Sequence, residues 1–349
     1  MVNVLLQNIK FRFIVEGVMP KINISYYLCS YVFIVLLLTL TGCSKEDTHL
    51  TDRQPLSVQP SEEITQAEEL SAENVSQVPE SIAGESQEEI AEPIIVNVDW
   101  ANYFDGINGA AVIYDPAQNC YQIYQQELAL TRRSPCSTFK IISSLIALEN
   151  GIIEPERSTH TWSGEQFWNA EWNKDIDFAD AFHTSCVWYF REVIDEIGKD
   201  KMQEELNRLQ YGNCDLSDWN GQLNTNNSNP ALTGFWIESS LLISPKEQVD
   251  VMKRIFSVPT DYSEETLNQL KQVMLLSEQE ETDISFYGKT GMGKAHGVVV
   301  DAWFTGFADA ADKRIYFCVY FGESDNQDVS SAKARETAVK IVSDYLTGR

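Results

Sequence analysis

The four residues Ser137-Thr138-Phe139-Lys140 open a segment that continues as the apolar run 141–148, which has a helical pattern. A serine and a lysine three residues apart on a helix lie on the same face. In the first turn, the serine also lies in the positive field of the helix N-terminus. Because an activated nucleophile needs a base within hydrogen-bond reach, the arrangement suits a catalytic serine. Taken alone, the same four residues also describe an ordinary helix start with an exposed lysine.

Two further motifs lie downstream of this tetrad. Ser185-Cys186-Val187 begins 48 residues after Ser137, and Lys289-Thr290-Gly291 begins 104 residues after Ser185. Ser-x-x-Lys, Ser-x-Val and Lys-Thr-Gly in this order resemble the motifs of serine β-lactamases and penicillin-binding proteins.

The middle motif, Ser185-Cys186-Val187, distinguishes between the classes of these proteins. Class A β-lactamases and many penicillin-binding proteins have asparagine where Val187 stands. Class A enzymes also use a glutamate in a Glu-x-x-x-Asn pattern, but Gln203 occupies that place here, and 203–207 is interpreted as a charged helix surface. The chain instead resembles class D β-lactamases over roughly residues 98–347. Besides Ser-x-Val, three motifs carry this resemblance: Tyr211-Gly212-Asn213, Phe235-Trp236-Ile237 and Trp303-Phe304-Thr305-Gly306.

The residue patterns predict an α+β fold. Residues 109–114 and 120–124 form a strand hairpin around a turn-rich spacer, and residues 137–280 are mainly helical. The C-terminal part then has strand patterns at 284–290, 298–307 and 314–321, followed by helical spacing over 330–346. We therefore expect an antiparallel sheet built from N- and C-terminal segments and flanked by helices, with an inserted helical subdomain. This is the two-subdomain β-lactamase/transpeptidase-like architecture, with the cleft between the subdomains.

The resemblance implies a mechanism for the catalytic residues. Ser137 would attack the β-lactam carbonyl and form an acyl-enzyme. Backbone N–H groups of Ser137 and Met292 would form the oxyanion hole. Ser185, aided by Lys289, would pass a proton to the leaving nitrogen.

Lys140 has a special role in this family. In class D enzymes the tetrad lysine reacts with carbon dioxide to form a carbamate (N6-carboxylysine), which acts as general base. The reaction requires a neutral amine, and burial among Phe139, Val187 and Ile237 would lower the lysine pKa. The indole of Trp236 resembles the donor that supports the carbamate, although a packing role is the alternative.

The resemblance also assigns residues to substrate binding. Thr290 and Arg335 would bind the substrate carboxylate, although a merely solvated arginine is the alternative. Tyr211 is expected to shape the pocket, since an unperturbed phenol titrates near pH ~10. The complete set of expected substrate-binding residues is Val187, Thr290, Gly291, Met292 and Arg335.

Composition limits the partners. The 349-residue chain has a net charge of −26, which argues against nucleic acid as a partner because phosphate binding needs a basic face. No Cys-x-x-Cys pair occurs and the four histidines are scattered, so we expect no metal and no cofactor other than the carbon dioxide of the modified lysine. Cys136 and Cys186 adjoin the two serines and are either oxidation-sensitive or compact packing residues.

The N-terminus predicts export. Residues 1–42 have the charged, apolar and small-residue order of a secretory signal, with Met19 as a second candidate start. Leu40-Thr41-Gly42-Cys43 resembles a bacterial lipobox, which implies lipidation of Cys43 and anchoring at the outer face of the cell membrane; a transmembrane anchor is the rival. Residues 44–93 contain 2 basic and 13 acidic side chains, so 43–93 is expected to be a disordered acidic tether. The catalytic domain would span 94–349.

Three functions remain at this stage. The first is a lipid-anchored class D β-lactamase that confers β-lactam resistance. The second is a receptor that is acylated by β-lactams without turnover, as in penicillin-sensing domains. The third is a D,D-transpeptidase or carboxypeptidase. The asparagine-containing loop, residues 214–234, is longer than expected for a class D enzyme, and its role and the oligomeric state are not predicted.

Overall fold

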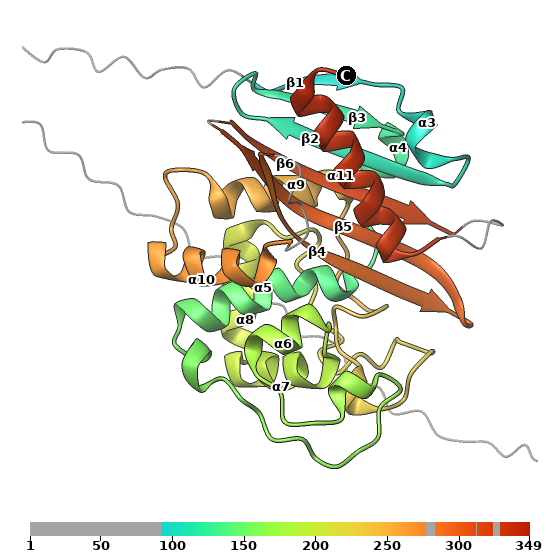
Figure 1. Cartoon of the computed structure of the whole chain (residues 1–349). Coiled ribbons are helices and arrows are strands. Elements are labelled where there is room, and N and C mark those ends of the chain that lie inside the picture. Colours follow the sequence, from blue (N-terminus) through green and yellow to red (C-terminus); the bar gives the residue numbers. More distant parts are fainter. Residues whose placement is uncertain (1–91, 277–282, 312, 324–328) are drawn as a thin grey trace, which may run out of the picture. The chain divides into compact units, whose positions relative to one another are not determined.

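The computed structural model describes residues 92–276, 283–311, 313–323 and 329–349 (Figure 1). The predicted signal segment 1–42, the lipid site Cys43 and nearly all of the tether lie outside these residues. Within the described residues, no helix is long and apolar enough to cross a membrane. The strands are β1 (Ile94–Asn97), β2 (Gly109–Asp115), β3 (Cys120–Tyr124), β4 (Ile284–Ala295), β5 (Val298–Ala310) and β6 (Lys313–Gly322). The helices are α3 (Ala101–Phe104), α4 (Gln126–Ala129), α5 (Lys140–Glu149), α6 (Phe178–His183), α7 (Val187–Ile197), α8 (Lys199–Leu209), α9 (Pro245–Phe256), α10 (Glu264–Met274) and α11 (Ser331–Thr347), with short 3₁₀ turns η1 (Cys136–Phe139), η2 (Pro155–Arg157), η3 (Ala170–Trp172) and η4 (Pro230–Leu232).

The strands form one sheet in the order β1-β3-β2-β6-β5-β4. The predicted hairpin is confirmed as β2 and β3, and the sheet joins strands from both parts of the chain as predicted. Neighbouring strands are antiparallel except at one edge, where β1 lies parallel to β3. The prediction of a wholly antiparallel sheet is wrong at this strand. β4 and β5 are longer than predicted because a two-residue turn, His296-Gly297, joins them directly, and both residues have the positive φ angles that such turns require.

Helices cover both faces of the sheet. Alternate residues of a strand point to opposite faces. In β2, Ala111 and Ile113 belong to one apolar cluster, whereas Ala110 and Val112 belong to the other. α11 packs on the first face and α9 on the second, so the sheet is the middle layer (Figure 1).

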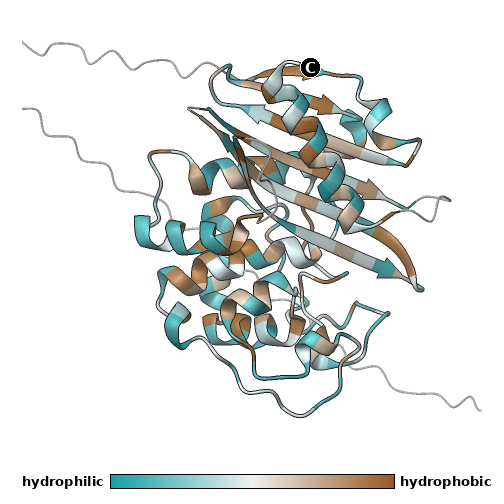
Figure 2. Ribbon diagram, viewed as in Figure 1, coloured by the Kyte–Doolittle hydropathy of each residue, from teal (hydrophilic) through white to brown (hydrophobic). Residues whose placement is uncertain are grey.

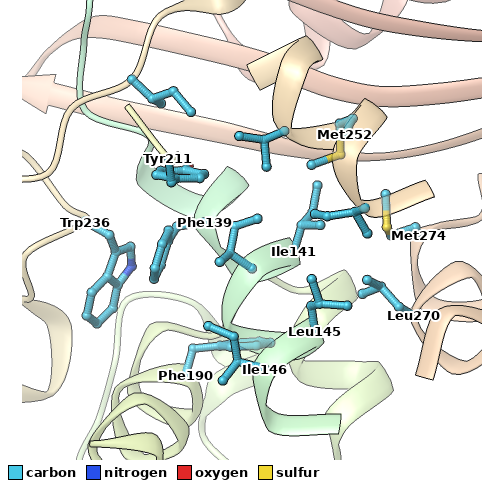
Figure 3. Close-up of a cluster of buried hydrophobic side chains, with 14 of the residues drawn as sticks. Phe139, Ile141, Leu145, Ile146, Phe190, Tyr211, Trp236, Met252, Leu270 and Met274 are labelled. Carbon is cyan, nitrogen blue, oxygen red and sulfur yellow. The ribbon is translucent and has the colours of Figure 1, made fainter. Parts of the chain in front are cut away.

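The helical subdomain is centred on α5. All but the last residue of this helix are buried, so it is surrounded by other elements rather than lying on the surface. Figure 3 shows its aliphatic side chains Ile141, Leu145 and Ile146 between aromatic residues on one side and methionines on the other. In Figure 2 the polar residues of the surrounding helices lie mainly on their outer faces. The predicted α+β architecture with a helical insertion is therefore confirmed, and it places η1, the turn that leads into α5, beside β4.

Candidate active site

Ser137 lies in the 3₁₀ turn η1, which runs directly into α5. The turn is fixed from both sides. The Cys136 N–H donates to the Trp236 carbonyl oxygen at 2.9 Å, and the Thr138 hydroxyl donates to the Pro135 carbonyl oxygen at 2.7 Å. Cys136 has a φ of 49°, a left-handed conformation that is uncommon outside glycine. The surrounding contacts therefore hold Ser137, the predicted nucleophile, on a sharp, defined turn.

Lys140 is fully buried as the first residue of α5. Its Nζ donates a hydrogen bond to Ser137 Oγ at 3.0 Å and lies 5.2 Å from the centre of the Phe190 ring. Burial lowers the pKa of Lys140 from 10.5 to about 8, because the charged amine is removed from water. A pKa of about 8 leaves a minority of this amine neutral near physiological pH, and both proton acceptance and carboxylation require that neutral form. The sequence predicted the spacing and the burial, but it did not identify Phe190.

Ser185 and Lys289 form a second serine–lysine pair. Ser185 lies between α6 and α7 with a φ of 57°, and it is not the side-chain cap of α7. Lys289, on β4, donates from Nζ to Ser185 Oγ at 2.5 Å and makes longer contacts with the carbonyl and hydroxyl oxygens of Thr290. Burial lowers the pKa of Lys289 to about 7, with a further contribution from the charge of Lys140. The structure thus brings together two motifs that lie 104 residues apart.

β4 packs closely against the nucleophile turn. A Cβ atom at Gly291 would lie 2.9 Å from the Pro135 carbonyl oxygen, and one at Gly293 would lie 3.0 Å from the sulfur of Cys136. Glycine at both positions lets the two backbones approach each other. Met292 stands between these glycines and is 39% exposed. The backbone of β4 therefore lies beside the turn of Ser137, where an oxyanion donor is needed.

An open groove of about 1130 Å³ adjoins the second pair. Lys289, Thr290 and Arg335 line it, so the two residues expected to bind a carboxylate share one groove. Arg335 is exposed on α11 and supplies positive charge in a strongly acidic chain. Val187, the other expected contact, is the partly exposed first residue of α7.

Trp236 is fully buried beside the nucleophile turn. Its indole stacks on Phe139 at 6.2 Å between ring centres, and Figure 3 shows the two rings side by side. Within the described part of the chain, no hydrogen bond joins the indole to Lys140. Gly234 is needed for this packing, because a Cβ there would lie 2.0 Å from the indole. The geometry shows a packing role, and the carbamate-supporting role stays a prediction.

Tyr211, Cys136 and Cys186 are buried, and burial makes all three less reactive. Tyr211 packs edge-on against Phe139, and burial raises the pKa of its phenol well above the ordinary value. Burial likewise raises the pKa of the Cys186 thiol to about 11 and that of Cys136 further. Low-pKa, accessible thiolates are the reactive form of cysteine. Both cysteines therefore fit the packing interpretation, and they are free thiols, as are Cys120, Cys214 and Cys318.

Gln203 is placed as the sequence suggested. It lies on α8 and donates from its amide to Asn207 Oδ1 at 3.1 Å and to the Cys214 carbonyl oxygen at 2.9 Å. It serves the helix surface and an adjacent turn. Among the described residues, no group of three histidine, cysteine, aspartate or glutamate side chains could hold a metal ion.

The sequence missed a carboxylate that links the segment after Trp236 to β4. Glu238, two residues after Trp236, accepts hydrogen bonds from the Lys294 backbone N–H of β4 and from the Asn226 side chain. Asn226 lies 12 residues before Glu238 in the sequence, and Lys294 lies 56 residues after it. A glutamate directly after the Phe-Trp-Ile motif was visible, but no local pattern connected it to β4.

The whole domain resembles proteins of known class. Residues 109–343 match the family model "Penicillin binding protein transpeptidase domain". Regulatory protein BlaR1 of Bacillus licheniformis is 32% identical over 246 residues, which cover 70% of this chain and 38% of that protein. The probable beta-lactamase YbxI of Bacillus subtilis is 28% identical over 251 residues, which cover 72% of this chain and 85% of that protein.

Solved structures show the same two kinds of relative. The C-terminal domain of the Bacillus licheniformis BlaR penicillin-receptor superposes with a TM-score of 0.63 at 30% identity and covers 73% of this chain and 98% of its own. A class D beta-lactamase from Sebaldella termitidis gives a TM-score of 0.62 at 26% identity and covers 74% and 99%. The matched region thus corresponds to nearly the whole of a class D enzyme but to 38% of the full BlaR1 protein.

Proposed function

This chain belongs to the penicillin binding protein transpeptidase domain family, and from that membership we propose that it is a class D type β-lactamase that confers resistance to β-lactams. The observation that carries the proposal is the environment of Lys140. The amine is fully buried, lies 3.0 Å from Ser137 Oγ and has a pKa lowered to about 8. A base that can be neutral beside the nucleophile serves both formation and hydrolysis of an acyl-enzyme.

Acylation follows from the contacts in the cleft. Ser137 Oγ attacks the β-lactam carbonyl carbon, and its proton passes to Lys140. The backbone N–H groups of Ser137 and Met292 stabilise the developing oxyanion. As the ring C–N bond breaks, Ser185 gives a proton to the nitrogen and is resupplied through Lys289, 2.5 Å away. Thr290 and Arg335 hold the substrate carboxylate in the adjoining groove.

Hydrolysis requires a base for water. The surroundings of Lys140 fit a carboxylated lysine, because the amine is in an apolar site beside Phe190 and its pKa is depressed. When carboxylated, Lys140 supplies a carboxylate-type general base. Water adds to the ester carbonyl, the bond to Ser137 Oγ breaks, and Ser137 regains its proton. Val187, partly exposed at the start of α7, contributes apolar surface beside this site, and the buried Trp236 packs against Phe139, the residue before Lys140.

The alternative is a penicillin receptor that stays acylated. Its support is the similarity to BlaR1 and to the BlaR penicillin-receptor domain. A third function, a D,D-transpeptidase or carboxypeptidase, has the same family fold. All three begin with acylation of Ser137, so the lifetime of the adduct distinguishes the first two and activity on a D-Ala-D-Ala peptide distinguishes the third.

The deciding experiment uses the full chain with a chromogenic cephalosporin and bicarbonate. We expect many product equivalents per protein and an adduct that decays within seconds in intact-protein mass spectrometry. Ser137→Ala should form no adduct. Ser144→Ala is the matched control in the adjoining helix α5, because its buried hydroxyl has no hydrogen-bond partner among the described residues. One product equivalent per protein together with a stable adduct would contradict the enzyme proposal and favour the penicillin receptor.

The location of the protein is also a proposal. We propose that Cys43 is lipidated and holds the domain at the outer face of the membrane through residues 44–93. Wild type should partition with membranes and incorporate labelled palmitate, whereas Cys43→Ala should do neither. Palmitate incorporation by the Cys43→Ala variant would contradict the anchor.

A further inference from the structure

We propose that Glu238 and Asn226 are positioning residues that hold the free edge of β4 next to Met292. Glu238 Oε1 accepts a hydrogen bond from the Lys294 backbone N–H, and Oε2 accepts one from the Asn226 side-chain amide. We call this pair the carboxylate–amide clamp. The inference rests on the proposed function, because its consequence is the rate at which Ser137 is acylated.

The clamp acts on an edge that the sheet leaves unpaired. β4 is the terminal strand, so one of its edges has no neighbouring strand. Residues two apart on a strand present their N–H groups to the same edge, and the Lys294 N–H therefore faces the same edge as that of Met292. The pairing of β4 with β5 also shifts register between Gly293 and Lys294. A charge-assisted hydrogen bond at this irregular point fixes the strand directly beyond the oxyanion donor.

Asn226 extends the clamp to the end of the hairpin. Its Oδ1 accepts the backbone N–H of His296 at 2.8 Å, in the turn between β4 and β5. Its own backbone N–H donates to Asn224 Oδ1 at 2.8 Å. One asparagine side chain therefore binds both Glu238 and the hairpin turn. This gives the asparagine-containing loop 214–234 a role, since it supplies the residue that joins Glu238 to the turn between β4 and β5.

Glu238 is also tied to the nucleophile turn. Its backbone N–H donates to Ser134 Oγ at 2.8 Å, and Ser134 Oγ donates to the Trp236 carbonyl oxygen at 3.1 Å. The same carbonyl oxygen accepts the N–H of Cys136, directly before the nucleophile. Glu238 has a φ of 51°, a conformation that contacts must hold in a residue other than glycine or asparagine. One residue thus connects the turn of Ser137 with the strand that carries the second oxyanion donor.

The contacts of Glu238 set the distance between the turn of Ser137 and the backbone of β4 at Met292, which matters for catalysis. Oxyanion donors act only when they lie near hydrogen-bond distance from the developing charge, and a misplacement of ~1 Å can cost about 100-fold in rate. Because Glu238 acts through Lys294, a loss of the clamp should slow acylation. It should leave the base at Lys140 and the pH dependence of adduct release unchanged.

Reversing the hydrogen-bond polarity tests the clamp. Glu238→Gln keeps an oxygen for Lys294 but turns an amide toward the amide of Asn226, so we expect acylation about tenfold slower. Asn226→Asp alone places two carboxylates together and should lose a similar factor. The double variant restores the bond, because the glutamine amide donates to the aspartate while the aspartate still accepts from His296. Its acylation rate should return to within about threefold of wild type.

The measurement is stopped-flow acylation of the full chain by a chromogenic cephalosporin, with adduct release followed by mass spectrometry. Glu165→Gln is the matched control, because Glu165 accepts a similar bond from Asn229 of the same loop at 2.5 Å but, among the described residues, has no hydrogen bond to β4. Its acylation should be unchanged. Thermal unfolding of each variant separates loss of folding from loss of positioning.

Several results would overturn the clamp. One is wild-type acylation in Glu238→Gln. Another is slower release with normal acylation, which would make Glu238 a base. A third is a folded double variant that does not recover. If Glu238→Gln does not fold, Asn226→Ala tests the same bond from the other side, and normal acylation there would count equally against it. A wild type that forms no adduct would instead refute the proposed function, and the clamp with it.

Discussion

The Ser137–Lys140 pair and the Ser185–Lys289 pair place the same two groups within hydrogen-bond distance, at 3.0 Å and 2.5 Å, but they are assembled in different ways. The first pair lies on one continuous stretch of chain, at the junction of η1 and α5. The second joins the connection between α6 and α7 to a strand on the far side of the insertion. The first pair is set by the local backbone, because its two residues are three apart in the chain. The second pair forms only when the helical subdomain is correctly packed against the sheet.

The two amines also differ in their surroundings. Among the described residues, the amine of Lys140 has hydrogen-bond contact with Ser137 alone and otherwise faces Phe190. Lys289 additionally contacts two oxygens of Thr290 and borders the open groove. An amine with few acceptors suits a base, and one with several acceptors suits a donor that holds and passes protons. The difference predicts that removing each lysine stops a different step.

The largest effect is expected for Lys140→Met. This change removes the amine that contacts Ser137 Oγ, so acylation should slow by 10²- to 10⁴-fold, the typical worth of a general base, and any adduct should persist for hours. Rapid-quench mass spectrometry measures both steps. Adduct release at the wild-type rate would mean that Lys140, carboxylated or not, has no role in hydrolysis.

A smaller effect is expected for Ser185→Ala. The leaving nitrogen loses its proton donor while Lys140 stays in place, so acylation should slow by about 100-fold and release of an adduct already formed should change little. Pre-formed adduct and single-turnover measurements separate the two steps. Equal losses in both would mean that the two pairs act as one unit and that their comparison fails.

The sequence predicted the first pair better than the second for a physical reason. Spacing on a helix determines which side chains are neighbours, so Ser137 and Lys140 follow from four residues. The contact of Ser185 with Lys289 depends on tertiary docking, and only the order of family motifs pointed to it. The hairpin of β2 and β3, the C-terminal strands and α11 also followed from local patterns and turn residues.

The contacts that the sequence did not predict also join residues that are far apart in the chain. Phe190 faces Lys140 from another helix, and Glu238 reaches β4 from the segment after Trp236. No periodicity connects such positions. The left-handed backbone at Cys136 and Ser185 is likewise imposed by packing, because neither residue type favours it.

Burial of Lys140 also makes the stability of the fold depend on pH. Burial depresses the pKa of Lys140 to about 8 from 10.5, so the folded state binds fewer protons than the unfolded state between these values. The buried amine therefore destabilises the fold most below pH 8, and this cost disappears as pH rises past 10.5. Lys140→Met should raise the free energy of unfolding at pH 7 by on the order of 3 kcal/mol, and by far less near pH 11. Urea unfolding at both pH values measures this; equal gains would mean that burial of charge is not the cause.

The smallest expected effect is the pH dependence of acylation and of adduct release. It tests most directly whether Lys140 and Lys289 have separate roles. Adduct release depends on neutral Lys140, so at constant dissolved carbon dioxide its rate should rise several-fold from pH 7 and level off above the pKa of about 8. Acylation additionally needs a proton through Lys289, whose pKa is lowered to about 7, so its rate should fall at high pH while release stays constant. Separate pH profiles of the two steps, measured from pH 6 to 10, would show this. Coincident profiles would mean that one ionisation governs both steps, and the two lysines would then have no separate roles.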